Sequence, residues 1–344
     1  MVAARRSPTM IDVATYAGVS SQTVSRVING SSSVRPATRA RVVAAVEELG
    51  YLPNAAARAL VTRRSRTIGV VSFGTRLYGP TSMVFGIEQA AREAGFFVSV
   101  ASEPTIDALT LRRALHRLGE QVVEGVVVIA PQKQAQLALT RLSPDVPAVV
   151  VDGHDVDGPP RVFVDHFSGA REATRHLLAQ GVRTVHHVAG PSDWVEAEER
   201  LEGWSSVLRE AGAVVHEPLR GDWSAASGYA AGRELARDPA VEAVFVANDH
   251  MALGLLKAFA EAGRDVPSDC LVVGFDGSPE AEFFRPALTT VHQDFSELGQ
   301  RSVHLLLAQI TGGPAPLATS VTAGLVVRAS SVRRGAPALL GGGP

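Results

Sequence analysis

Hydrophobic and polar positions follow two different patterns along the chain, and the change comes near residue 66. In residues 9–50, apolar side chains recur at helical spacing and predict three short helices separated by turn residues. From Thr67 onward, short apolar runs such as TIGVVSF and AVFVA alternate with helical stretches. Such runs are typical of parallel sheets covered on both faces. The pattern therefore predicts an α/β protein, in which an all-helical N-terminal segment precedes a two-lobed body with two parallel sheets covered by helices.

The stretch from Thr9 to Gly30 predicts two helices joined by a tight turn. Thr9 can cap the first helix, with Asp12 in its first turn, and Gly18 permits the positive φ that ends it. Ser20 can cap the second helix. The expected apolar positions are Ile11, Val13, Ala14 and Ala17 in the first helix and Val24, Val27 and Ile28 in the second. Two helices joined in this way form a helix-turn-helix, whose second helix lies in the major groove of DNA.

The second helix carries candidate DNA contacts. Gln22 and Arg26 are four residues apart on one face, and both side chains can form paired hydrogen bonds with base edges. Short polar side chains suit phosphate oxygens, which position a protein without reading the base sequence. These further candidates are Ser20, Ser21, Thr23, Ser25 and Asn29. The alternative is an ordinary surface pair of helices, but the adjoining segments favour the DNA reader.

A third helix, from Pro36 to Gly50, should close the small core, and a hinge follows it. Asn54 can cap a run of good helix formers that is too short to be stable alone in water. We interpret residues 54–62 as a hinge helix that orders on DNA or against a second copy of itself, with Leu60 as a minor-groove wedge. Its candidate DNA contacts are Asn54, Ala57 and Leu60. A plain flexible linker is an equally open interpretation.

Charge is distributed unevenly between these parts. Residues 1–66 hold ten arginines and three acidic residues, whereas the whole chain of 344 residues has a formal net charge of −2. A basic head on an acidic body is typical of a nucleic-acid-binding segment joined to a domain with another task. There is no apolar run long enough to span a membrane and no secretory signal, so we expect a cytoplasmic protein. The single cysteine, Cys270, excludes an internal disulfide and is expected to be buried.

The body is predicted to alternate strands with helices throughout. The expected helices cover 81–94, 107–118, 132–142, 168–180, 196–211, 224–236 and 249–262. Further strands near 290 and 320 follow the second series of strands. The chain should therefore cross between two lobes more than once and leave a cleft between them.

Ligands of open α/β sheets bind beyond the carboxyl ends of the strands. Asp152, Asn248 and Asp276 follow predicted strands, although a helix cap or loop brace is the simpler interpretation for any one of them. Asp249, for example, is expected to cap the helix that follows it. Candidate partners are the forked donor of Arg200 and the apolar face of Trp223, a combination that suits a polyhydroxylated ring such as a sugar.

Taken together, these segments resemble the lactose-repressor (LacI) family of bacterial transcription regulators. The stretches DVATYAGVSSQTVSRVING, LGYLPNAAARAL and IGVV are similar to that family's DNA reader, hinge and first body strand. The stretches GDWSAASG, VANDHMALG, VVGFD and LTTVHQDF resemble its sugar-binding part, closest to the lactose-responsive branch. The resemblance implies a periplasmic-binding-protein fold, a homodimer, and a pseudo-palindromic operator of double-stranded DNA.

The resemblance also implies where a small-molecule sugar effector binds. The implied contacts are Leu77, Pro80, Met83, Asp152, Arg200, Trp223, Asn248, Asp276 and Phe295. Glu196 completes the candidate set and stands where the lactose branch has a small hydroxyl side chain. Phe73 and Ile129 also depart from that branch, so the resemblance indicates a sugar without fixing which one.

The expected domains follow from these assignments. They are a helix-turn-helix DNA-binding domain at 1–51, a hinge helix or linker at 52–66, an effector-binding and dimerisation body at 67–332, and a flexible tail at 333–344. Within the body, the N-lobe should comprise about 67–164 and 292–322, and the C-lobe about 165–291 and 323–332. The tail has no leucine heptad, so we expect a dimer without a tetramerising helix.

The sequence therefore predicts a DNA-binding repressor that a galactoside-like sugar releases from its operator. The alternatives are a co-repressor-type regulator that responds to another ligand class such as a purine, and a sugar receptor that does not act on DNA. An enzyme is not expected, because the chain has no dinucleotide fingerprint, phosphate loop, zinc-protease motif or paired nucleophile and base. We expect no cofactor, no metal and no membrane partner.

Overall fold

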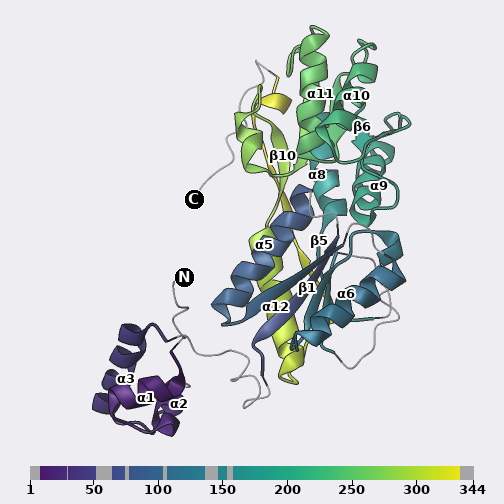
Figure 1. Ribbon diagram of the computed structural model, residues 1–344. Coiled ribbons are helices and arrows are strands. Elements are labelled where there is room, and N and C mark those ends of the chain that lie inside the picture. Colours follow the sequence, from purple (N-terminus) through teal and green to yellow (C-terminus); the bar gives the residue numbers. More distant parts are fainter. Residues whose placement is uncertain are drawn as a thin grey trace, which may run out of the picture. The chain divides into compact units, whose positions relative to one another are not determined.

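The computed structural model describes residues 8–28, 30–51, 64–73, 77–103, 107–135, 146–152 and 158–333. The chain divides into two compact units, Met1–Ser65 and Arg66–Pro344, and each is described by itself (Figure 1). The predicted hinge helix at 54–62 and most of the helix expected at 132–142 lie outside the described residues. No helix in the described part of the chain combines the length and the apolar character needed to cross a membrane.

The first unit is a three-helix fold, with α1 at Met10–Ala17, α2 at Ser21–Ile28 and α3 at Pro36–Leu49. The predicted caps are present: the Thr9 hydroxyl accepts from the Asp12 backbone, and Gly18 ends α1 at a φ of 62°. The core comprises Val13, Ala14, Ala17, Val24, Val27, Val42, Ala45 and Tyr51.

One predicted core position in the first helix is wrong. Ile11 is 67% exposed, whereas Val13 is fully buried. Two residues along an α-helix correspond to a rotation of about 200°, so Ile11 and Val13 lie on opposite faces of α1.

The body of the protein contains two sheets with helices packed against them. The first sheet has the order β11-β5-β4-β3-β1-β2, and all its pairs are parallel. Its strands are β1 (Thr67–Phe73), β2 (Phe97–Glu103), β3 (Val126–Ile129), β4 (Ala148–Val151), β5 (Arg161–Val164) and β11 (Ala318–Val321). The strands β1, β3 and β4 are almost entirely buried, which explains their continuous apolar sequences.

The second sheet has the order β12-β10-β9-β8-β6-β7, and only β12 runs antiparallel to its neighbour. Its strands are β6 (His186–Ala189), β7 (Leu219–Arg220), β8 (Ala243–Val246), β9 (Leu271–Asp276), β10 (Thr289–Gln293) and β12 (Ala323–Val326). The prediction of two parallel sheets is therefore confirmed, apart from the antiparallel strand β12.

Helices surround each sheet (Figure 1). Around the first sheet lie α5 (Tyr78–Glu93), α6 (Ala108–Glu120) and α12 (Phe295–Ile310). Around the second lie α8 (His166–Ala179), α9 (Val195–Glu210), α10 (Ala225–Leu235) and α11 (Asp249–Glu261). Two short 3-10 turns, η1 (Pro279–Phe283) and η2 (Ala329–Ser331), lie in the C-terminal part of the body.

The chain passes between the two lobes three times within residues 158–333. It leaves the first sheet after β5, returns after β10 to form α12 and β11, and crosses again to β12. The expected single strand near 320 is therefore two strands, one in each sheet. Three elements that the pattern did not predict are β5, β7 and α12. The two strands are short and carry arginines, whereas α12 has apolar residues at helical spacing that could have revealed it.

The helices α5 and α12 approach each other closely. A Cβ atom added at Gly86 would lie 2.1 Å from the backbone oxygen of Phe295, and one added at Gly299 would lie 2.2 Å from the backbone of Gly86. This contact requires the two glycines, and it fixes α5, whose N-terminus faces the second sheet's lobe at the candidate site.

Candidate functional site

A pocket lies where the N-terminus of α5 faces the carboxyl ends of strands in the second sheet. It is lined by Leu77, Tyr78, Gly79, Pro80, Met83, Trp194, Glu196, Arg200, Trp223, Asn248, Asp276 and Gln293. The first five residues belong to one lobe, and most of the others follow strands of the other lobe. The pocket therefore occupies the position where open α/β sheets bind ligands.

Two lining residues have backbone conformations that are rare for residues other than glycine. Asp276, at the end of β9, has a φ of 111°, and Trp223 has a φ of 72°. The indole of Trp223 lies against Gly190, where an added Cβ would lie 2.3 Å from the ring. Strained backbone of this kind tends to cluster at functional sites, where the surrounding structure holds it in place.

Arg200 is the central charged group of the pocket, with a side chain that is only 3% exposed. Its guanidinium donates to the Ala247 carbonyl and lies 3.6 Å from Asp276 Oδ1. It also stacks over the ring of Phe275, 3.9 Å from the centroid. The aromatic ring and these acceptors compensate the buried positive charge and hold the planar donor fork in one orientation.

The acidic side chains of the pocket are buried, which favours their neutral forms. Burial raises the pKa of Asp276 to about 7, although the Arg200 charge acts in the opposite direction. Asp276 Oδ1 also accepts a 2.7 Å hydrogen bond from Gln293 Nε2. Burial and the Asp152 carboxylate raise the pKa of Glu196 well above its usual range, again against Arg200.

Three buried polar atoms, each on a residue that lines this pocket, have no hydrogen-bond partner among the described residues. They are Glu196 Oε2, Trp223 Nε1 and Gln293 Oε1. A buried polar atom without a partner costs free energy, and such atoms are rare in folded proteins. The Trp223 nitrogen is a donor, the Gln293 oxygen is an acceptor, and the Glu196 oxygen can accept or donate according to its protonation. The ring centroids of Trp194 and Trp223 lie 5.6 Å apart.

The structure brings eight of the ten sequence-derived effector residues to this pocket. The two that do not line it are Asp152 and Phe295. Phe295 lies in an adjoining groove, with its ring 5.8 Å from that of Tyr78. Asp152 lies close to Glu196. Tyr78, Trp194 and Gln293 line the pocket but were not among the sequence candidates, although Gln293 belongs to the LTTVHQDF stretch that suggested a sugar site.

The capping role expected for Asp249 is wrong. Asn248 caps α11, since its Oδ1 accepts from the Met251 backbone, and its Nδ2 donates to the Trp223 carbonyl. Asp249 is buried and accepts instead from Thr290 Oγ1 at 2.6 Å and from the Ser278 backbone at 2.7 Å. Asn248 is therefore partly committed to holding Trp223 in place.

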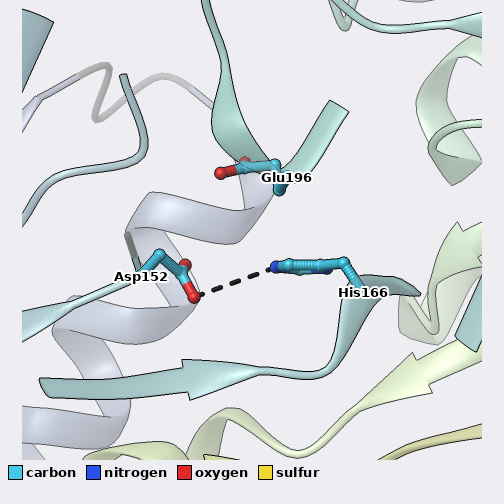
Figure 2. Close-up of side chains that lie close together, drawn as sticks. All are labelled: Asp152, His166 and Glu196. Atoms are coloured by element: carbon cyan, nitrogen blue, oxygen red, sulfur yellow. Dashed lines mark ion pairs between the residues drawn. The ribbon is translucent and has the colours of Figure 1, made fainter. Parts of the chain in front are cut away.

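Asp152, His166 and Glu196, the last of which also lines the pocket, lie close together (Figure 2). One ligand atom from each lies within 4.8 Å of the others, and all three side chains are buried. His166 Nε2 is 3.8 Å from Asp152 Oδ1. Asp152 comes from the end of β4 in one lobe, whereas His166 and Glu196 come from the start of α8 and α9 in the other.

This cluster has the side-chain types that bind metal ions, but the His166 ring carries its proton on the nitrogen that would have to bind the metal. Arg200 Nε and Nη2 lie 3.4 Å and 3.3 Å from His166 Nδ1. Because a guanidinium can only donate, Nδ1 must accept, and the ring proton resides on Nε2. A histidine that binds a metal through Nε2 instead donates from its other nitrogen. The three residues therefore do not fit a metal ion.

On the helical unit, the two base-reading candidates are both exposed on α2: Gln22 and Arg26. Ser20 is exposed as well, and its hydroxyl accepts from the Thr23 backbone at 3.2 Å, so it caps α2 as expected. Ser21, Thr23 and Ser25 are half-buried on the same helix. Asn29, Asn54, Ala57 and Leu60 lie outside the described residues.

Both units match known protein families. Residues 9–54 match the model for bacterial regulatory proteins of the lacI family, and residues 174–331 match that of a periplasmic binding protein-like domain. The chain is 38% identical to the lactose operon repressor of Escherichia coli K12, over 89% of this chain and 86% of that protein. It is 40% identical to the regulator CelR of Thermobifida fusca, over 90% of this chain and 93% of CelR.

Solved structures agree with these sequence matches. A lac repressor dimer bound to operator and the anti-inducer ONPF superposes with a TM-score of 0.84 at 35% identity, covering 95% of this chain and all of that one. A CelR–cellobiose complex superposes with a TM-score of 0.70 at 36% identity, covering 94% of this chain and 99% of that one. Since these relatives match the helical unit and the body over nearly their whole lengths, the chain belongs to the lacI family of bacterial regulatory proteins.

Proposed function

We propose that the protein is a DNA-binding transcriptional repressor whose operator affinity falls when a sugar binds in the pocket between its lobes. The observation that carries the proposal is the convergence of Arg200, Asp276 and two indoles on one pocket that both lobes line. The exposed pair Gln22 and Arg26 on α2 supplies the complementary part, a helix face suited to base edges.

The pocket offers both kinds of contact that a sugar ring needs. The fork of Arg200, the Asp276 carboxyl and the free Oε1 of Gln293 can exchange hydrogen bonds with ring hydroxyls. The indoles of Trp194 and Trp223 provide apolar faces for the C–H side of a ring. Two relatives support this ligand class: one is named the lactose operon repressor, and the other, CelR, has a solved structure in complex with cellobiose.

Coupling to DNA follows from the way in which the two lobes share the pocket. A ligand that contacts Met83 on α5 and Trp223 in the other lobe stabilises one lobe arrangement over the other. If DNA favours the other arrangement, each ligand weakens the binding of the second by the same factor. The coupling free energy of such systems is about 1–3 kcal/mol.

A second copy of the chain is the expected protein partner. A groove beside the pocket is lined by apolar residues that include Phe85, whose side chain is 63% exposed, and Phe295. A related repressor is a dimer on its operator. We propose a homodimer that presents two copies of α2 to a pseudo-palindromic operator in the cytoplasm, where bacterial chromosomal DNA is located.

We also propose that the bound sugar is not chemically changed. The matched relatives are regulators. The buried Asp276 is held by Arg200 and Gln293, so its role is to position a hydroxyl. Incubation with lactose or cellobiose should leave both disaccharides intact.

The test is a titration of the protein with a fluorescent operator duplex, selected from randomised pseudo-palindromes, at one fixed salt concentration. Mono- and disaccharides are then added singly, and at least one should weaken DNA binding about tenfold. A purine or sugar that tightens binding would instead identify a co-repressor system. A protein that binds the duplex but shows no response to any sugar would contradict the proposal.

Two variants locate the sugar site. Trp223→Ala removes an indole face and should abolish the sugar response while DNA affinity without sugar stays unchanged. Arg200→Ala should do the same, and the exposed Arg233→Ala on α10 is its matched control. Because loss of Arg200 leaves Asp276 without its cation, thermal unfolding of each variant must be recorded first. Undiminished sugar affinity in both variants would mean that the pocket is misassigned.

A further inference from the structure

We infer that the pocket is built for a sugar that carries a positively charged amino group, rather than for a neutral sugar. The inference rests on the proposed function, since it specifies the ligand of the same pocket. It follows from an excess of buried acidic groups at the pocket, from buried oxygen atoms without a partner on residues that line it, and from the aromatic rings beside them.

Among the described residues around the pocket, buried acidic groups outnumber buried basic groups. Three carboxyl groups are buried there, with residue exposures of 2% for Asp152, 7% for Glu196 and 5% for Asp276. One guanidinium, that of Arg200, is buried with them and is paired with Asp276 at 3.6 Å. Burial and the Arg200 charge lower the pKa of His166, so this ring stays neutral and adds no positive charge.

Glu196 is the buried carboxyl group with which a positively charged ligand would pair. It lines the pocket, at the start of α9, and its Oε2 is buried without a partner. Close to it lies Asp152, whose Oδ2 also has no partner among the described residues (Figure 2). In the empty pocket Glu196 can take up a proton, which removes the cost of a buried negative charge. A neutral sugar cannot compensate that charge, so Glu196 would have to stay protonated when such a sugar binds. An ammonium group supplies the compensating positive charge together with three donors.

Two further features of the pocket suit an ammonium. Gln293 Oε1 is a second buried acceptor without a partner, because the amide nitrogen of the same side chain donates to Asp276. The indoles of Trp194 and Trp223 present π-faces on the same pocket, and such faces attract cations. A metal ion would also supply positive charge, but the Arg200 donors on His166 Nδ1 leave that ring without a lone pair for it.

The experiment compares sugars that differ only in this group. Calorimetric titrations at pH 6.5 pair glucose with glucosamine, galactose with galactosamine, and cellobiose with fully deacetylated chitobiose. The amino form of at least one pair should bind about tenfold more tightly, since charge-assisted hydrogen bonds are about twice as strong as neutral ones. N-acetylglucosamine, which lacks the charge, should lose this advantage. Equal affinity within every pair would overturn the inference.

Two variants assign the preference to Glu196. Glu196→Gln keeps the size of the side chain and removes its charge, so the advantage of the amino sugar should disappear. Glu202→Gln, the same change at an exposed position on α9, is the matched control and should keep the advantage. An amino-sugar preference that persists in Glu196→Gln would contradict the assignment. The comparison in the unmodified protein decides the inference even if this variant does not fold.

The experiments distinguish a failure of this inference from a failure of the proposed function. If neutral sugars bind and release DNA but amino sugars gain nothing, the inference fails and the proposed function stands. If no sugar of either kind binds, the proposed function fails and the inference fails with it.

Discussion

The buried carboxyl of Asp249 should make the stability of the body depend on pH. Asp249 is 1% exposed, and burial raises its pKa to about 6, against the hydrogen bonds from Thr290 and Ser278 that lower it. In the unfolded chain the pKa is about 3.9. A carboxyl with a raised pKa in the folded state contributes stability at pH values below about 4, and this contribution is lost as the pH rises through about 6.

The size of the effect follows from the shift. A difference of about 2 units corresponds to about 3 kcal/mol, because each unit is worth 1.36 kcal/mol. Asp249→Asn cannot ionise and should therefore gain about 3 kcal/mol on the unmodified protein between pH 4 and pH 7. At pH 4 Asp249 is protonated, and the variant should be slightly less stable, because both oxygens of the carboxyl are placed to accept from Thr290 and Ser278, whereas the amide has only one acceptor oxygen.

The assay is urea-induced unfolding at several pH values, with both proteins at the same concentration. Asp193→Asn, at an exposed position, is the control and should show no such gain. A difference in unfolding free energy between Asp249→Asn and the unmodified protein that stays constant from pH 4 to pH 7 would refute the reasoning. It would mean that water or a shift of the backbone solvates the Asp249 carboxylate.

Three further outcomes are expected. Gly86→Ala should lower the unfolding free energy by about 1–3 kcal/mol in urea titrations, because its Cβ would lie 2.1 Å from a backbone oxygen of α12. The control is Gly119→Ala on α6, which should not be destabilising because an added Cβ would have no neighbour within 4 Å. Burial raises the pKa of Cys270 to about 12, so a thiol reagent should label it only when the body unfolds, and rapid labelling of the native protein would contradict its burial. Arg26→Ala should relax the preference for one base step in binding selections. Ser20→Ala, which also removes the α2 cap, should lower the affinity for all duplexes alike. Identical sequence preferences in the two variants would show that the division into base contacts and phosphate contacts is wrong.

Much of the fold is local and could be predicted. The capping box of Thr9 and Asp12 depends on a spacing of three residues, so the sequence displays it directly. The strands β1, β3 and β8 are continuous apolar runs because both faces of each are buried, and such runs are visible in the sequence. In contrast, β7 has two residues and offers no pattern to detect.

The candidate site was predictable only in part. Arg200, Asp276 and Trp223 were found because they follow strand ends or resemble a family pattern, and the structure does bring them together. Gln293 was missed because its role depends on the hydrogen bond to Asp276, 17 residues away in the chain. The helix cap was assigned to Asp249 instead of Asn248, because adjacent polar residues at a helix start look equivalent until the position of Thr290 is known.

The sequence by itself determined the class of this protein: a helix-turn-helix head on an α/β body, with a family pattern along nearly the whole chain. These features depend on residues within a few positions of one another, where periodicity and capping act. Only the tertiary structure decided the charge balance of the pocket, because Asp152, His166 and Glu196 come from three elements in two lobes. Burial and distance set the protonation of such groups, and neither quantity exists until the chain is folded.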